Sequence, residues 1–103
     1  SPEYVSLVDT GDVFARMPSK RKQAVEAYLA AWERRHEGVL ALKLAALFEQ
    51  QADPESRRLW LERAVDALPP GKERDRAGAH LIDLLQKTGA PAEVLESWRG
   101  KLS

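Results

Sequence analysis

The stretch DPESRRLWLERAVDALPP, residues 53–70, contains the complete signature of one short helix. Asp53 is a typical N-cap residue, and the proline and glutamate that follow suit the first turn. The two prolines at the other end cannot continue a helix. Between them, apolar residues recur at the spacing of one helix face: Leu61, Ala64, Val65 and Leu68. The stretch predicts an amphipathic helix that packs on one side, with Arg58 and Glu62 paired on the other.

Similar start and stop residues predict three helices before this one. Ser1 is expected to cap the first helix, which ends at Pro18. Ser19 is expected to cap the second, which stops at Gly38. The third, VLALKLAALFEQQ at residues 39–51, is apolar nearly all round, which is typical of a helix buried on more than one side.

Two more helices are predicted after residue 70. One covers Glu73–Thr88 and stops at Gly89, and the other begins at Pro91. Six helices with short connections predict an all-α fold with antiparallel neighbours. Gly11 lies inside the first helix, where glycine costs about 1 kcal/mol relative to alanine, so we expect its packing to require it.

The composition is that of one globular domain. Of the 103 residues, 44% are hydrophobic and 31% are charged. The 16 basic and 16 acidic residues balance, which argues against a dedicated nucleic-acid partner. There is no cysteine, no signal peptide at the start, and no apolar stretch long enough to span a membrane. Because the chain starts at a serine and ends soon after a helix, we expect a fragment whose targeting signals lie outside it.

The helical pattern repeats along the chain with a period of roughly 34 residues. Phe14 is followed one period later by Phe48 and then, after a slightly longer interval, by Leu85. In the second helices, Ala24-x3-Tyr28-x2-Ala31 returns about one period later as Arg57-x3-Leu61-x2-Ala64. Such a period is typical of stacked helical hairpins.

Over almost its whole length the chain resembles the tetratricopeptide repeat family. The copy nearest the middle is similar to that family's motif at Leu44, Ala45, Phe48, Leu61, Ala64 and Pro69. Two further copies are carried by Gly11, Phe14, Ala24, Tyr28 and Ala31, and by Leu85, Val94 and Trp98. The resemblance implies a right-handed α–α superhelix of about three antiparallel hairpins. A single domain over 1–103 would then hold repeats at 4–37, 38–74 and 75–103.

The resemblance also implies a protein–protein interaction scaffold and not an enzyme. Arrays of this family bind a partner protein or peptide in a concave groove lined by the first helices. The chaperone-binding members hold a C-terminal carboxylate with a lysine and an asparagine, but Leu42 and Ala46 occupy those places here, so that ligand is not expected. Helical phase would place these residues in the groove: Asp12, Arg16, Glu49, Gln50, Arg76, Asp83, Gln86 and Lys87, with the apolar Val5, Val8, Leu42, Ala46 and Ala79.

Two narrower functions stay open. The richness in alanine, leucine and arginine is typical of bacterial proteins, and the chain is similar in style to periplasmic tetratricopeptide scaffolds of polysaccharide-secretion systems. It would then be an assembly module that recruits a modifying enzyme. The alternative is a sensor domain of a bacterial transcription regulator. The two functions imply different compartments, bacterial periplasm or cytoplasm, and the sequence does not decide between them. Self-association through apolar repeat ends is also expected, with Val94, Leu95 and Leu102 at the C-terminal one.

No motif predicts catalysis, a cofactor or a metal site. His36 and His80, the only histidines, fall on different helices without an acid cluster, so both are interpreted as surface or turn residues. Three tryptophans, Trp32, Trp60 and Trp98, fall on second helices, and we interpret them as core residues in preference to an exposed ligand-stacking face.

Two features break local rules. Arg57 occupies a place where the family has a small alanine, and we expect its guanidinium to reach solvent in preference to pairing with Glu49 or Asp53. The segment SKRKQ, residues 19–23, places three cations in a first helical turn against the helix dipole, with Arg16 nearby. A functional surface and an ordinary solvated turn are both compatible with this segment.

Overall fold

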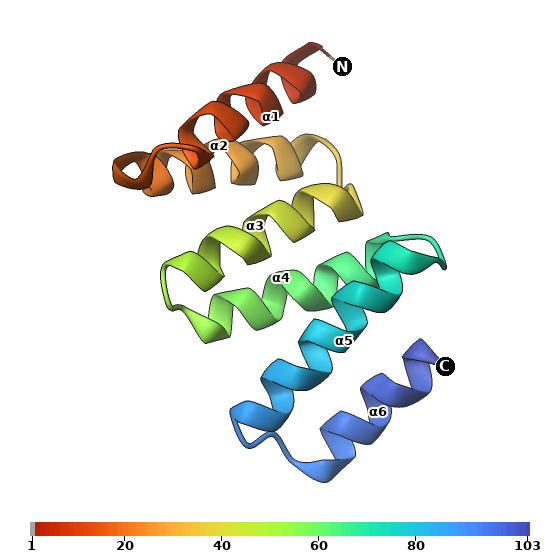
Figure 1. The fold of residues 1–103 in the computed structure, drawn as a ribbon. Coiled ribbons are helices and arrows are strands. Elements are labelled where there is room, and N and C mark those ends of the chain that lie inside the picture. The colour runs from red at the N-terminus through yellow and green to blue at the C-terminus, as the bar shows by residue number, and fades with distance from the viewer. Residues whose placement is uncertain (1) are drawn as a thin grey trace.

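Six α-helices follow one another along the computed structural model, which describes residues 2–103 (Figure 1). Successive helices run back and forth, so the chain forms three antiparallel hairpins (Figure 1). No strand occurs within residues 2–103, and the predicted all-α class is confirmed. The helices are α1 (Pro2–Ala15), α2 (Arg21–Arg34), α3 (Gly38–Gln50), α4 (Pro54–Ala67), α5 (Lys72–Lys87) and α6 (Ala92–Leu102), with a short 3₁₀ helix, η1 (Pro18–Lys20), before α2.

The start of α4 has the side-chain cap that the sequence predicts. The Asp53 carboxylate accepts hydrogen bonds from the Ser56 hydroxyl at 2.7 Å and from the Ser56 backbone N–H at 3.1 Å. These two bonds lower the pKa of Asp53. Further along α4, Arg58 and Glu62 form the predicted i, i+4 pair, with Nε and Oε2 3.0 Å apart. The helix boundary and its outer face are therefore both encoded locally.

Two predicted boundaries are wrong. Ser19 lies inside η1, and α2 has Lys20 as its N-cap residue, without a side-chain cap hydrogen bond. Gly38 does not stop α2, which ends at Arg34; it is the first residue of α3. A β-carbon at Gly38 would overlap the side chain of Leu68 and lie 3.0 Å from its backbone nitrogen. Glycine is required at this position because α3 begins against the end of α4, a long-range contact that no local stop signal reveals.

The other boundaries differ only slightly from the predicted ones. Gly89 follows α5 with a positive φ of 74°, which suits a helix stop at glycine. Pro91 is the N-cap residue of α6 and not its first helical residue, a difference within the usual scatter. The expected cap of α1, Ser1, lies outside the described residues.

One apolar core runs through the whole stack. On α2 and α4, the buried indoles of Trp32 and Trp60 meet edge to face with ring centroids 5.1 Å apart. Trp98 on α6 is half-buried against the same core. The interpretation of the tryptophans as core residues is thus confirmed for Trp32 and Trp60. The largest side chains that are fully buried are Leu40, Leu44, Leu81, Leu85 and Val65.

The residues predicted to be equivalent in the three hairpins occupy similar places in their helices. Phe14 lies one residue before the end of α1, while Phe48 and Leu85 lie two residues before the ends of α3 and α5. All three contact the core. A repeating unit of two helices is therefore consistent with the fold.

The last helix, α6, packs its apolar residues onto the fold. Val94, Leu95 and Leu102 are each half-buried against the core, so only part of each side chain is left exposed at the predicted apolar end surface. The contact is close, because a β-carbon on Gly78 of α5 would overlap the Leu102 side chain.

Within residues 2–103, no helix combines the length and the apolarity needed to cross a membrane.

Candidate functional site: a hollow between α3, α4 and α5

A small hollow lies where α3, α4 and α5 meet, with a volume of about 220 Å³. Three of the residues predicted to line a groove, Leu42, Ala46 and Glu49, belong to it. Ala45 and Leu61 add apolar wall, and two polar side chains complete the lining, Arg57 from α4 and His80 from α5. The hollow is therefore mostly apolar, with charged groups on its lining.

Larger openings also lie on the surface. One of about 780 Å³ is lined only by residues of α1, among them Val5, Asp9 and Val13. A single helix face cannot enclose a ligand, so the size of this opening reflects open solvent along the helix. Another, of about 470 Å³, lies between α5 and α6 and includes the predicted residues Ala79, Asp83 and Gln86. The predicted groove is thus divided between two hollows.

Arg57 lines the hollow and forms an ion pair with Glu49. Its Nη2 lies 3.5 Å from Oε2 of Glu49, and its side chain is only 17% exposed whereas that of Glu49 is 62% exposed. The expectation that Arg57 reaches solvent in preference to pairing is therefore corrected: the stem is covered and the guanidinium pairs with Glu49. A second hollow of about 210 Å³, lined partly by Asp53 and Leu84, shares both Arg57 and Glu49 with the first.

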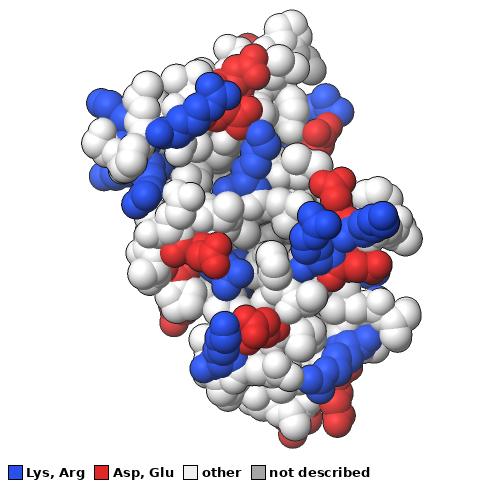
Figure 2. Space-filling view, viewed as in Figure 1, with Lys and Arg blue, Asp and Glu red and all other residues white. Residues whose placement is uncertain are grey.

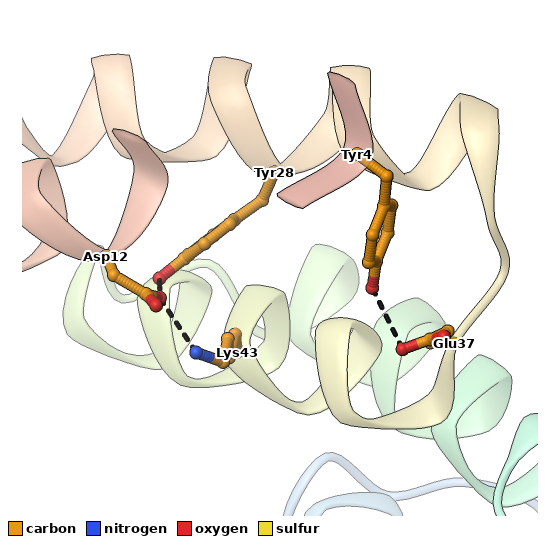
Figure 3. A network of polar contacts seen from close by, with 5 residues as sticks. All are labelled: Tyr4, Asp12, Tyr28, Glu37 and Lys43. Carbon is orange, nitrogen blue, oxygen red and sulfur yellow. Dashed lines mark hydrogen bonds and ion pairs between the residues drawn. The ribbon is translucent and has the colours of Figure 1, made fainter. Parts of the chain in front are cut away.

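Asp12 is not a free groove residue, because its carboxylate joins three helices (Figure 3). Its Oδ1 accepts hydrogen bonds from the Lys43 ammonium of α3 at 2.7 Å and from the Tyr28 hydroxyl of α2 at 2.5 Å. Burial alone would raise the pKa of Asp12, but these bonds and the nearby charges of Lys43 and Arg16 outweigh it and lower the pKa. Burial of the Tyr28 hydroxyl raises its pKa, and the hydrogen bond to the negatively charged Asp12 raises that pKa further. The predicted binding residue is thus a structural link between the first two hairpins.

A second link lies at the other end of α1. The Tyr4 hydroxyl donates a hydrogen bond to Oε2 of Glu37 at 3.1 Å (Figure 3). The Arg35 guanidinium lies 5.0 Å from the centre of the Tyr4 ring. Burial and the neighbouring Glu37 raise the pKa of Tyr4. Both links tie α1 to the start of the second hairpin.

The other predicted groove residues are exposed, with the exception of Val8. Asp83 and Lys87 form an i, i+4 pair on α5, with Nζ and Oδ2 3.0 Å apart. Arg16, Gln50 and Arg76 are exposed and line neither of the two hollows that hold the rest of the set. Val5 is exposed and Val8 half-buried on α1.

Sequence reasoning missed His80, Lys43 and Glu37 as parts of these sites. Lys43 lies 31 residues from Asp12 and Glu37 lies 33 residues from Tyr4, so no local spacing could have connected them. One signal was present for Lys43, since it interrupts the apolar run of α3 and a charge in such a helix needs a partner.

The two histidines lie in different surroundings. His36 is exposed in the turn between α2 and α3, where its ring stacks on that of Trp32 with centroids 4.4 Å apart. His80 is exposed on α5. Among residues 2–103, no three side chains of the metal-binding types are grouped so that they could hold an ion. The hollow has apolar walls, the ion pair of Arg57 and Glu49, and the imidazole of His80, a combination that is suited to binding a ligand through apolar and polar contacts.

Comparisons with protein-family models, with curated proteins and with solved structures find no match for this chain.

Proposed function

We propose that the chain is a tetratricopeptide-like interaction scaffold, and that the hollow between α3, α4 and α5 receives one apolar side chain of a partner peptide. The observation that carries the proposal is the hollow itself, with walls from three helices and Leu42, Ala46 and Leu61 among its lining. A partner protein could present such a side chain from an extended segment or from a helix.

The size of the hollow favours a side chain over a small molecule. Pockets for drug-sized ligands and cofactors measure about 300–1,000 Å³. The hollow of about 220 Å³ lies below that range and suits one leucine- or phenylalanine-sized group. The ligand would be part of a longer chain that makes its remaining contacts outside the hollow.

The ion pair gives the site a polar component. Arg57 is held in place by its covered stem, while Glu49 is largely exposed and free to exchange its partner. A guanidinium has five N–H donors in a fixed geometry, so Arg57 can also bind a backbone carbonyl or a carboxylate beside the apolar anchor. The partner we propose therefore combines one apolar side chain with a neighbouring acceptor group.

The right-handed superhelix is part of the same proposal. It is supported by three consecutive hairpins, by core contacts of Phe14, Phe48 and Leu85 at similar helix positions, and by the period of the sequence repeat. In such an array each hairpin covers the next, which leaves first helices available to a ligand.

A blocked hollow tests the proposal. Ala46 is exposed at the hollow, so Ala46→Trp fills it without entering the core. The matched control is Ala67→Trp, at an exposed position of α4 that does not line the hollow. Peptides selected from a displayed random library against the wild-type chain provide the ligands, and their affinities are measured by fluorescence anisotropy.

The expected result is a set of peptides that share an apolar residue and bind Ala46→Trp at least about thirtyfold more weakly than wild type, as at an interface hot spot. Their affinity for Ala67→Trp should be unchanged. Selected peptides that bind Ala46→Trp as tightly as wild type would exclude the hollow as the binding site.

A further inference from the structure

The charges of this chain are distributed unevenly along it. From residue 13 to residue 25 there is no acidic residue and there are four basic ones, Arg16, Lys20, Arg21 and Lys22. The chain has 16 basic and 16 acidic residues, so the remaining residues carry 16 − 4 = 12 basic and 16 acidic residues, a balance of −4. A chain that is neutral overall thus has one corner of charge +4, which we call the basic corner.

The basic corner is formed by the end of α1, η1 and the first turn of α2. In Figure 2, blue atoms gather without red ones at the left edge, over the connection between α1 and α2. Arg16, Lys20 and Lys22 are exposed and Arg21 is half-buried. Within residues 2–103 none of the four forms an ion pair, whereas every helix from α2 to α6 contributes at least one cation to an ion pair elsewhere in the molecule.

Apolar side chains accompany these charges. Met17, at the connection itself, is 42% exposed, and Val13, one turn earlier on α1, is 48% exposed. The corner is the connection between two antiparallel helices, and this connection lies at an edge of the molecule (Figure 1). The corner therefore combines two exposed apolar side chains with four cations that are close to them in the sequence.

We propose that the basic corner docks onto an anionic lipid surface, with the cations at the headgroups and Met17 at the boundary with the acyl chains. This combination of basic residues with an exposed apolar side chain suits the interfacial region of a membrane. The proposal does not depend on the peptide site in the hollow, because the two surfaces share no residue.

The geometry disfavours the other polyanions. A single-stranded nucleic acid needs exposed aromatic rings for base stacking, but Phe14 is half-buried in the core and Tyr28 is buried. A folded acidic partner is bound best by cations that are held in fixed positions, whereas no hydrogen bond within residues 2–103 holds the side chains of Lys20, Arg21 or Lys22. Cations without such bonds suit a fluid, laterally mobile array of anions.

Vesicle co-sedimentation tests the proposal. The lipids are phosphatidylcholine alone and an equimolar mixture with phosphatidylserine, at low and at high salt. Each surface cation contributes about fivefold to partitioning onto anionic lipid at low salt. Wild type should therefore bind the mixed vesicles and not the neutral ones, and high salt should release it. In the double variant Lys20→Glu/Lys22→Glu, partitioning should fall by at least about thirtyfold.

The control is Lys72→Glu/Arg76→Glu, which makes the same change of charge at exposed positions near the start of α5. It should bind the mixed vesicles within about twofold to threefold of wild type, because only charges close to the lipid contribute strongly. Met17→Ser should weaken binding to the mixed vesicles severalfold without changing its dependence on salt.

Three results would overturn the proposal. The first is a wild-type chain that does not sediment with the mixed vesicles at low salt. The second is an equal loss of binding in the control variant, which would mean that net charge and not the corner governs binding. The third is tighter binding to a soluble poly-glutamate peptide than to the mixed vesicles, which would assign the corner to an acidic protein segment.

Discussion

Gly11 of α1 lies directly against the ring of Tyr28 of α2, and there is no room between them for a β-carbon. This contact explains a glycine inside a helix, where its backbone freedom is unfavourable. We expect Gly11→Ala to destabilise the fold by about 1–3 kcal/mol, because overpacking against the buried ring outweighs the gain of about 1 kcal/mol in helix propensity. Chemical denaturation measures the change.

The chain contains a matched control for this substitution. Gly100 is also inside a helix, α6, but a β-carbon there would meet no atom within 4 Å. Gly100→Ala should therefore stabilise the fold by up to about 1 kcal/mol. If both substitutions changed the denaturation midpoint in the same direction, the contact with Tyr28 would not be the reason for Gly11.

The Asp12 carboxylate is expected to stabilise the link between the first two hairpins. At neutral pH, Asp12→Asn should lower the free energy of unfolding by about 1 kcal/mol. This is less than the full value of a charged hydrogen bond, because the side chains of Asp12 and Lys43 are 30% and 35% exposed and solvent screens their interaction. The control Asp83→Asn breaks a pair whose side chains are more than half exposed and should cost less than about 0.5 kcal/mol.

The stability difference between wild type and Asp12→Asn should depend on pH in one direction. The folded pKa of Asp12 is lowered, so its contribution is fully present above the unfolded value of about 3.9 and is lost as the pH falls through the folded pKa. Urea denaturation of both proteins from pH 7 down to about pH 3 should show a constant difference that then shrinks. A difference that stays the same in acid would attribute the effect to side-chain geometry instead of charge.

The parts of this fold that are encoded locally could be predicted, and the parts made by distant residues could not. Asp53 caps α4 through a neighbour three residues away, and both the cap and the helix were predicted. Gly38 looked like a stop for α2 because glycine often ends helices, but its role depends on Leu68, which lies at the far end of α4. The end of α2 was therefore predicted wrongly, because a glycine that is required for a tertiary contact has the same appearance in the sequence as a glycine that stops a helix.

The candidate site shows the same division. Helical periodicity predicted that Leu42, Ala46 and Glu49 would share a surface, because all three lie on α3. It could not predict that His80 of α5 would complete the hollow, nor that Asp12 would be used to hold helices together. Residues on one helix can be placed relative to one another from their spacing, whereas pairs between helices require the packing.

Ala64 gives a direct test of how closely the helices approach one another. It is fully buried on α4, at the position where the repeat motif has a small residue. We expect Ala64→Leu to destabilise the fold by about 1–3 kcal/mol through overpacking. The same substitution at the exposed Ala67 should change stability by less than about 0.5 kcal/mol. Equal denaturation midpoints for wild type and Ala64→Leu would show that the helix contact has spare volume.

Two substitutions of Arg57 separate the contribution of its stem from that of its charge. Arg57→Met keeps the apolar stem and removes the guanidinium, and it should stay within about 1 kcal/mol of wild type because the lost partner, Glu49, is 62% exposed. Arg57→Ala also removes the covered methylenes and should cost about 1–2 kcal/mol, with little dependence on salt. If Arg57→Ala were as stable as wild type, the stem would contribute nothing to stability, and the small residue of the repeat motif would fit this contact equally well. If methionine were as damaging as alanine, and salt did not change the loss, the pair with Glu49 would hold α4 against α3 more strongly than its exposure allows.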